Sequence, residues 1–206
     1  MSAADDYLTD RSRISMLKRA YQAGDVYAFR ENMTCDEFPW PLAFRWFATL
    51  TGVPKTFQAA FADAWCDTKG PLLRARSHAT LCGALRAMMP PYVGRRPRRL
   101  FRGAMLREHA SGKYGISWSA SMEAARDFAR AKQETAKRLR ENGISEADAA
   151  VFETLAPLAA IIAKVTYPEP FTAAERAVFP NAIERHHEQE FLVDYRLLQS
   201  VIVRQL

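Results

Sequence analysis

The sequence predicts an α+β fold, with helices in the first part of the chain and strands mainly in the second. Residues 10–90 carry apolar side chains at helical spacing, whereas short apolar runs typical of strands follow residue 98. Between them lies a basic run interrupted by proline, Gly94-Arg95-Arg96-Pro97-Arg98-Arg99. Because helices and strands are segregated and do not alternate regularly, an α+β arrangement is favoured over a parallel α/β one.

The length and composition are those of a globular protein with one core and an appended subdomain. The chain has 206 residues, of which 49% are hydrophobic, and this is enough to bury a core. We expect a helical N-terminal subdomain at 1–93 and a sheet-containing core at 94–206. Within the core, the segment from about 130 to 157 is expected to be a helical insertion.

Membrane attachment and export are not expected. No apolar run approaches the ~18 residues that cross a bilayer. The N-terminus, Met1–Asp6, is polar and acidic, unlike a signal peptide. Cys35, Cys66 and Cys82 lack metal-ligand spacing and are interpreted as reduced core thiols. We therefore expect a cytoplasmic protein, whose net charge of +6 permits a polyanionic partner without requiring one.

Four helices are predicted in the N-terminal part from start signals, stop signals and apolar spacing. Their expected starts are Asp10, Pro41, Pro54 and Ser77. Glycine or proline ends three of them, at Gly24, Gly52 and Pro90-Pro91. The aromatic residues could form a platform for stacking nucleic-acid bases. Their 3.6-residue periodicity, not interleaved with arginines, favours the inward face of a small helical bundle.

Five strands are predicted in the second part, at Arg99–Met105, Gly115–Ser119, Ala160–Tyr167, Phe191–Leu198 and Val201–Leu206. A helix that begins after a cap at Ser119 or Ser121 is expected to run to Asn142-Gly143. Ser145 with Asp148 resembles another helix start, and Pro157 would follow that short helix. Thr172 begins a capping-box pattern, and a loop is expected from Phe179 to His187.

Three short motifs carry residues suited to chemistry on a nucleotide. Arg102 lies in Phe-Arg-Gly on the first predicted strand, Ser117 in Gly-Ile-Ser-Trp-Ser on the second, and Glu190 in Glu-Gln-Glu-Phe-Leu-Val at the start of a later one. A guanidinium stays charged and binds oxyanions in bidentate fashion, and Gly103 beside it would let a ligand approach the backbone. Taken singly, these residues are usually a surface arginine, a helix cap and a solvated strand end. Their ordered combination is far more specific.

The combination resembles the Arg-Ser-Glu group of mono-ADP-ribosyltransferases, of the type found in bacterial toxins and phages. The resemblance covers roughly residues 98–206 and implies an ADP-ribosyltransferase-like split β-sandwich core with NAD as substrate. It implies that Arg102 is the arginine of the first core strand and that Glu190 is the catalytic glutamate. Ser117-Trp118-Ser119 is similar to the Ser-Thr-Ser motif, from which Trp118 departs. Candidate NAD-binding residues are Arg102, Gly103, Ser117, Trp118, Ser119 and Phe128.

The resemblance also implies a macromolecular acceptor for ADP-ribose. Glu188 stands at the first glutamate of the family's Glu-x-Glu, where a glutamate accompanies protein arginine as acceptor. The arginine run at 94–99 points instead to RNA or DNA, so both acceptors stay open, with protein arginine favoured. The loop Phe179–His187 would recognise the acceptor, and His187 is a candidate contact. Adjacent His186 and His187 seldom reach one metal, so no metal site is predicted.

The expected biological role is that of an intracellular toxin or effector, with a neutralising antitoxin as a potential partner. Three alternatives remain. The protein could be an NAD glycohydrolase with water as the acceptor, a non-catalytic nucleic-acid-binding module, or a structural protein that kept the fold and lost the reaction.

Overall fold

The computed structural model describes residues 10–35, 38–67, 77–142, 148–165 and 189–204. The chain divides into two compact units, Met1–Pro90 and Pro91–Leu206. The division falls at the proline pair that ends the last N-terminal helix.

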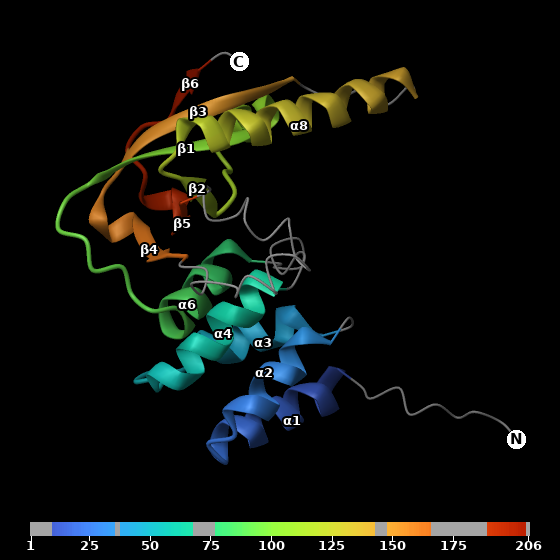
Figure 1. The fold of residues 1–206 in the computed structure, drawn as a ribbon, viewed down its shortest axis with the longest axis vertical. Helices are drawn as coiled ribbons and strands as arrows, with labels where there is room; N and C mark the ends of the chain where they lie inside the picture. The colour runs from blue at the N-terminus through green and yellow to red at the C-terminus, as the bar shows by residue number, and fades with distance from the viewer. Residues whose placement is uncertain (1–9, 36–37, 68–76, 143–147, 166–188, 205–206) are drawn as a thin grey trace, which may run out of the picture. The chain divides into compact units, whose positions relative to one another are not determined.

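The first unit consists of helices. Five described helices are drawn in Figure 1: α1 (Asp10–Gln22), α2 (Val26–Thr34), α3 (Trp40–Phe47), α4 (Lys55–Asp67) and α6 (His78–Met88). Their aromatic side chains form the core, and Phe29, Phe47 and Phe61 are fully buried in it. The rings meet in tilted and edge-to-face contacts, such as the edge-to-face contact of Phe29 with Phe57 at a centroid distance of 5.0 Å. The 3.6-residue periodicity therefore marks a core face.

Helix α2 is an element that the sequence pattern did not predict. It begins at Val26, and Gly24, with a φ of 74°, lies in the turn after α1 where the end of that helix was expected. The carboxylate of Asp25 caps the new helix by accepting a hydrogen bond from the Ala28 amide at 2.9 Å. A nine-residue helix gives only a short periodic signal, and this one follows its predecessor after a very short turn.

The second unit is built on a sheet. Its strands are β1 (Arg98–Met105), β2 (Ser117–Ser119), β3 (Ala149–Ala156), β4 (Ile161–Lys164), β5 (Glu190–Val193) and β6 (Ile202–Arg204). They form one six-stranded sheet in the order β4-β5-β2-β1-β3-β6. Every pairing is antiparallel. With helices segregated from an antiparallel sheet, the α+β prediction is confirmed.

The sheet has a seam between its two central strands. β1 and β3 pair along eight residues, whereas β2 and β5 pair along three. Among the described residues, a single register pair, Phe101 with Ser119, joins β1 to β2. The sheet is thus two three-stranded parts, β4-β5-β2 and β1-β3-β6, held together at one point by their own ladder.

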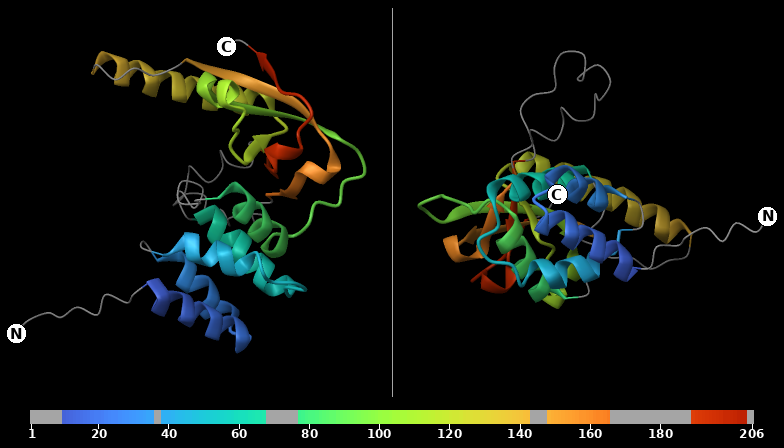
Figure 2. Two further views of the ribbon diagram at one scale, coloured as in Figure 1. Left: turned by 180° about the vertical axis from the view of Figure 1, so that it is seen from behind. Right: turned by 90° about the horizontal axis from the view of Figure 1, so that it is seen from below.

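The long helix α8 (Met122–Glu141) covers one face of the β1-β3 part, as the views in Figure 2 show. Alanines at 125, 129 and 136 lie on its buried side and pack against Phe101 and Val151. The hydroxyl of Ser121 caps the helix by accepting from the Ala124 amide at 3.2 Å. A second buried cluster, which includes Trp118, Phe152 and Phe191, forms the other part of the core.

The predicted short helix between Ser145 and Pro157 is wrong. Residues Ala149–Ala156 form β3, an inner strand of the sheet, so the segment 130–157 is no helical insertion. Seven of the eight β3 residues are buried. A strand buried on both faces shows no alternation, and its sequence cannot be told from a buried helix by periodicity. The carboxylate of Asp148 does not cap a helix here. It accepts hydrogen bonds from Gln133 at 3.0 Å and from Arg140 at 2.7 Å, both on α8.

Two other predicted elements, the capping box at Thr172 and the loop Phe179–His187, lie outside the described residues. Within the described part of the chain, no helix is both long and apolar enough to cross a membrane.

Candidate functional site

Arg102, Ser117 and Glu190 lie together at the seam of the sheet. The Arg102 guanidinium donates through Nη1 to the carbonyl oxygen of Ser117 at 2.7 Å. The Ser117 hydroxyl donates in turn to Oε1 of Glu190. A continuous chain of contacts therefore links β1 to β2 across the seam and continues from β2 to its ladder partner β5.

Strand pairing explains how Glu190 reaches Ser117, which lies 73 positions earlier in the sequence. In the β2-β5 ladder Ser119 pairs with Glu190 and Ser117 pairs with Leu192. Alternate residues of a strand share a face, so Ser117 and Glu190 are diagonal neighbours. The residue before Glu190, Gln189, has a φ of 42°, which non-glycine residues rarely adopt, and its carbonyl accepts from the Ala120 amide at 3.2 Å. Local backbone strain thus accompanies the start of β5.

Glu108 is a site residue that sequence analysis missed. It lies on α7 (Leu106–Ser111), a short helix directly after β1. Its carboxylate accepts from Nε of Arg102 at 3.0 Å, from Nη2 at 3.4 Å and from the Gly115 amide at 3.1 Å. The Arg102 and Glu108 side chains are only 15% and 21% exposed, so this ion pair is largely removed from water. A single glutamate in a six-residue helix carries no sequence signal of such a role.

Lys132 brings a second cation to the same carboxylate. It lies on α8, and its Nζ is 3.8 Å from Oε1 of Glu108. The pKa of the Lys132 ammonium is lowered, first because burial removes water from it and second because the Arg102 guanidinium repels it. Glu108 favours the charged form but does not outweigh these two effects. Arg102, Lys132 and Glu108 thus form a charged cluster in which one carboxylate contacts two cationic side chains.

Burial and the nearby charge also act on Tyr114, in the turn before β2. Its pKa is raised, first by desolvation and then by the negative charge of Glu108. Its hydroxyl and Nδ1 of His109 form a hydrogen bond of 2.7 Å. A neutral tyrosine hydroxyl therefore lies near the charged cluster.

Gly115 and Gly103, near and beside Arg102, each leave space for a different neighbour. A Cβ on Gly115 would lie 2.1 Å from Nη2 of Arg102, so the missing side chain makes room for the guanidinium. A Cβ on Gly103 would lie 2.1 Å from the carbonyl oxygen of Ala125 and 2.5 Å from the amide nitrogen of Ala129, both in α8. The expectation that Gly103 admits a ligand to the backbone is therefore wrong, because a helix occupies that space.

The structure describes three further residues that were predicted to bind NAD: Trp118, Ser119 and Phe128. Trp118 is 1% exposed, lies in the core, and donates from Nε1 to the carbonyl oxygen of Gly115 at 3.0 Å. A role for Trp118 in ligand contact is therefore wrong. The Ser119 hydroxyl is buried and accepts from the Ser121 amide at 2.9 Å, at the start of α8. Phe128 lies on α8 with 47% exposure, and its role stays a prediction.

Other predicted residues cannot be placed. Glu188 and the pair His186-His187 lie outside the described residues. Gln189 and Glu190 are described, so the Glu-x-Glu motif is seen only in its second half.

The arginine run at 94–99 is partly engaged within its own unit. Arg98 donates to the Tyr92 hydroxyl at 2.9 Å and lies over the Phe191 ring, 5.5 Å from its centroid. Arg99 lies 3.4 Å from the Glu153 carboxylate. Arg95 and Arg96 are exposed. Half of the predicted phosphate-gripping run therefore has internal partners.

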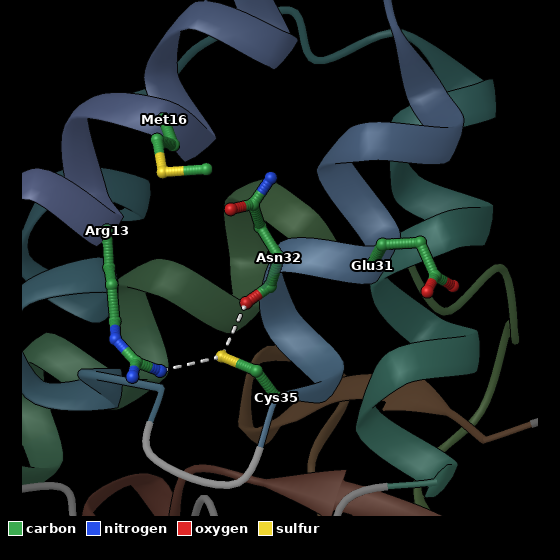
Figure 3. Close-up of a pocket in the computed structure, with 5 residues that line it drawn as sticks. All are labelled: Arg13, Met16, Glu31, Asn32 and Cys35. Carbon is green, nitrogen blue, oxygen red and sulfur yellow. Dashed lines mark hydrogen bonds between the residues drawn. The ribbon is translucent and has the colours of Figure 1, made fainter. Parts of the chain in front are cut away.

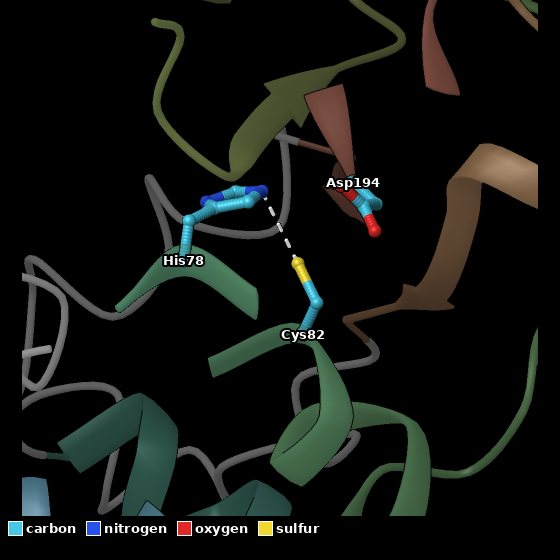
Figure 4. Close-up of side chains that lie close together, drawn as sticks. All are labelled: His78, Cys82 and Asp194. Carbon is cyan, nitrogen blue, oxygen red and sulfur yellow. Dashed lines mark hydrogen bonds between the residues drawn. The ribbon is translucent and has the colours of Figure 1, made fainter. Parts of the chain in front are cut away.

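The three cysteines all lie in the helical unit, and the two with described side chains have different settings. Cys82 is buried and its sulfur lies 3.2 Å from Nε2 of His78, one turn earlier on α6 (Figure 4). Cys35 is exposed, which corrects its assignment to the core. Its sulfur accepts from Arg13 at 3.1 Å and donates to the Asn32 carbonyl at 3.2 Å, as Figure 3 shows. These residues line a pocket of about 370 Å³ together with Met16 and Glu31.

Comparison with known proteins gave no relative: no family model matches the chain, and neither a curated protein nor a solved structure does.

Proposed function

We propose that this protein is an NAD-dependent mono-ADP-ribosyltransferase that modifies a macromolecule and acts as an intracellular toxin or effector. The observation that carries the proposal is the contact chain from Arg102 through Ser117 to Glu190, which joins three strands at the seam of the sheet. The seam also supports an ADP-ribosyltransferase-like fold, because it divides the sheet into two parts as a split β-sandwich requires.

The reaction breaks the bond between C1′ of the ribose and the nicotinamide nitrogen. The bonding electrons leave with nicotinamide, which becomes neutral, and positive charge develops on the ribose. A carboxylate held nearby stabilises this charge, and a group fixed in advance does so without reorganising. Glu190 fits this role because β5 holds its backbone and the Ser117 hydroxyl holds its carboxylate. The acceptor then bonds to C1′ and releases a proton.

We assign protein arginine as the favoured acceptor because of Glu188, whose carboxylate would orient a guanidino group near C1′. RNA or DNA is the next candidate, supported by exposed Arg95 and Arg96. Engagement of Arg98 and Arg99 by Tyr92 and Glu153 weakens that second candidate.

The test measures nicotinamide release from NAD by purified protein. Glu190→Gln keeps the shape and removes the charge, so turnover should fall by roughly 10²–10³, the typical effect of one preorganised electrostatic group. Glu134→Gln, an exposed change on α8, is the matched control and should retain full turnover. Near-full turnover in Glu190→Gln would contradict the assignment, as would the absence of nicotinamide release in the unmodified protein.

Labelled NAD added to whole lysate identifies the acceptor. Label that protease removes and nuclease leaves supports protein arginine, and Glu188→Gln should abolish this transfer while some NAD hydrolysis continues. Label that nuclease removes would replace arginine with a nucleic acid. Free ADP-ribose as the sole product would make the protein a glycohydrolase.

A further inference from the structure

A single carboxylate gathers two cations beside the candidate active site. Oε1 of Glu108 lies 3.4 Å from Nη2 of Arg102 and 3.8 Å from Nζ of Lys132. The two cationic nitrogens are therefore no farther apart than the sum of these distances. They come from different elements, β1 and α8, so the sheet and the helix that covers it together fix their spacing.

Both cations keep hydrogen-bonding capacity while they hold Glu108. A guanidinium has five N–H donors, and the contacts of Arg102 with described residues use one on each nitrogen. An ammonium has three donors, and the Lys132 Nζ lies 3.8 Å from Glu108, at ion-pair distance. A second anion can therefore bind without displacing Glu108.

We infer that Arg102 and Lys132 together bind the diphosphate of the dinucleotide substrate, with Lys132 as a second phosphate-binding residue. The identity of the nucleotide rests on the proposed function. Two cations at this spacing suit two neighbouring phosphate groups, since each can contact one of them.

The order of the contacts supports this placement. From Lys132 the chain passes through Glu108 and Arg102 to Ser117 and then to Glu190. The cations are thus linked to the backbone carbonyl of Ser117, and the carboxylate for the ribose is linked to its hydroxyl. A dinucleotide presents the same order, with its diphosphate next to the ribose that carries nicotinamide.

The charges around Lys132 link anion binding to proton uptake. It is influenced by Arg102 on β1 and by Arg107 and Glu108 on α7, and its pKa is lowered by desolvation and by the two arginines. A bound diphosphate favours the ammonium form, so binding raises the pKa of Lys132. The affinity for the diphosphate should then fall as pH rises through the pKa of Lys132 in the ligand-free protein. The raised pKa of Tyr114 keeps its hydroxyl neutral to a higher pH than usual, so Tyr114 does not account for this fall.

The test measures ADP-ribose affinity of the full chain by calorimetry, with adenosine as the ligand that lacks phosphates. Lys132→Met keeps the apolar stem and should weaken ADP-ribose binding by roughly 10- to 100-fold, as for a charge-assisted hydrogen bond. Lys137→Met, an exposed change on the same helix, should leave it unchanged. From about pH 7 to pH 10, below the ordinary lysine pKa of ~10.4, affinity should fall in the unmodified protein and stay level in Lys132→Arg.

The outcomes separate this inference from the proposed function. Unchanged affinity in Lys132→Met, or an equal loss in Lys137→Met, would overturn the role of Lys132. Failure of the unmodified protein to bind ADP-ribose would overturn the whole diphosphate site. Lys132-dependent binding without nicotinamide release would support the diphosphate site and count against the transferase. Nicotinamide release by the unmodified protein, with unchanged ADP-ribose affinity in Lys132→Met, would support the transferase and count against the role of Lys132.

Discussion

Arg102 has a structural task in addition to its proposed role in phosphate binding. It connects β1 to the Ser117 carbonyl of β2 at the seam, where the ladder supplies one register pair among the described residues. It also holds α7 through Glu108. Replacing Arg102 therefore tests two functions at once, and a loss of NAD binding in Arg102→Ala would not by itself identify a phosphate contact.

Gly115→Ala displaces the Arg102 guanidinium and keeps its charge in the protein. The added Cβ would lie 2.1 Å from Nη2 of Arg102, the far end of a flexible side chain, so the guanidinium can move and the fold can remain. We expect nicotinamide release to fall at least tenfold because Arg102 loses its position. The free energy of unfolding should fall by about 1–3 kcal/mol, because the displaced guanidinium leaves Glu108 and the Ser117 carbonyl. Thermal melts and turnover assays on the same sample measure both. Full turnover in Gly115→Ala would show that the position of Arg102 is unimportant.

Lys132 illustrates a cost of building the proposed diphosphate site. Its folded-state pKa is lowered, so the unfolded chain binds this proton more tightly. The charge on Lys132 therefore opposes folding below the folded-state pKa, and this opposition disappears as pH rises through that pKa toward the unfolded value. A bound anion would remove the same opposition, which is the usual relation between a binding site and stability.

Arg102, Ser117 and Glu190 could be proposed from the sequence because three short motifs occur in a specific order, although no single motif is specific. Sequence analysis missed Glu108 and Lys132, whose importance arises from a meeting of α7 with α8 that no local pattern encodes. It also assigned Trp118 to the ligand, although alternation along β2 turns this side chain into the core, away from its serine neighbours.

At the scale of elements, the packing of α8 on β1 depends on Gly103. A Cβ there would meet the backbone of Ala125 and Ala129 at 2.1 and 2.5 Å, and a helix backbone cannot move as a side-chain tip does. We expect Gly103→Ala to lower the free energy of unfolding by about 1–3 kcal/mol, the range for overpacking a core. Denaturant titration measures it, with Gly115→Ala as the comparison. A Gly103→Ala protein as stable as the original would mean that α8 does not pack this closely.

The elements that sequence patterns predicted best are the helices with one buried face and the strand β1. Helices α1, α3, α4 and α6 and strand β1 were all expected within a few residues of their observed bounds. The mistaken element is β3, since Ala149–Ala156 is buried on both sides and lacks alternation. The order of strands in the sheet could not be predicted, because it depends on pairings such as that of Ser119 with Glu190, distant in sequence.

At the scale of the whole molecule, the described contacts of the candidate site lie in one unit. Arg102, Glu108, Ser117, Lys132 and Glu190 all belong to Pro91–Leu206, and so do the strands and the helix that carry them. Each unit is larger than the ~50 residues at the lower end of domain sizes. The helical unit has its own aromatic core, with Phe29 and Phe61 fully buried. The site therefore does not require helices α1 to α6 for the contacts described above.

A fragment of residues 91–206 tests this separation. We expect it to fold, because its cores on β1, β3 and α8 and around Trp118 come from its own residues. It should bind ADP-ribose within about tenfold of the affinity of the full chain, a difference of ~1.4 kcal/mol. Circular dichroism measures the fold, calorimetry measures the affinity, and the same fragment with Lys132→Met is the control for specific binding. A folded fragment that binds no ADP-ribose would show that residues 1–90 complete the site, and a fragment that fails to fold would show that the units depend on each other.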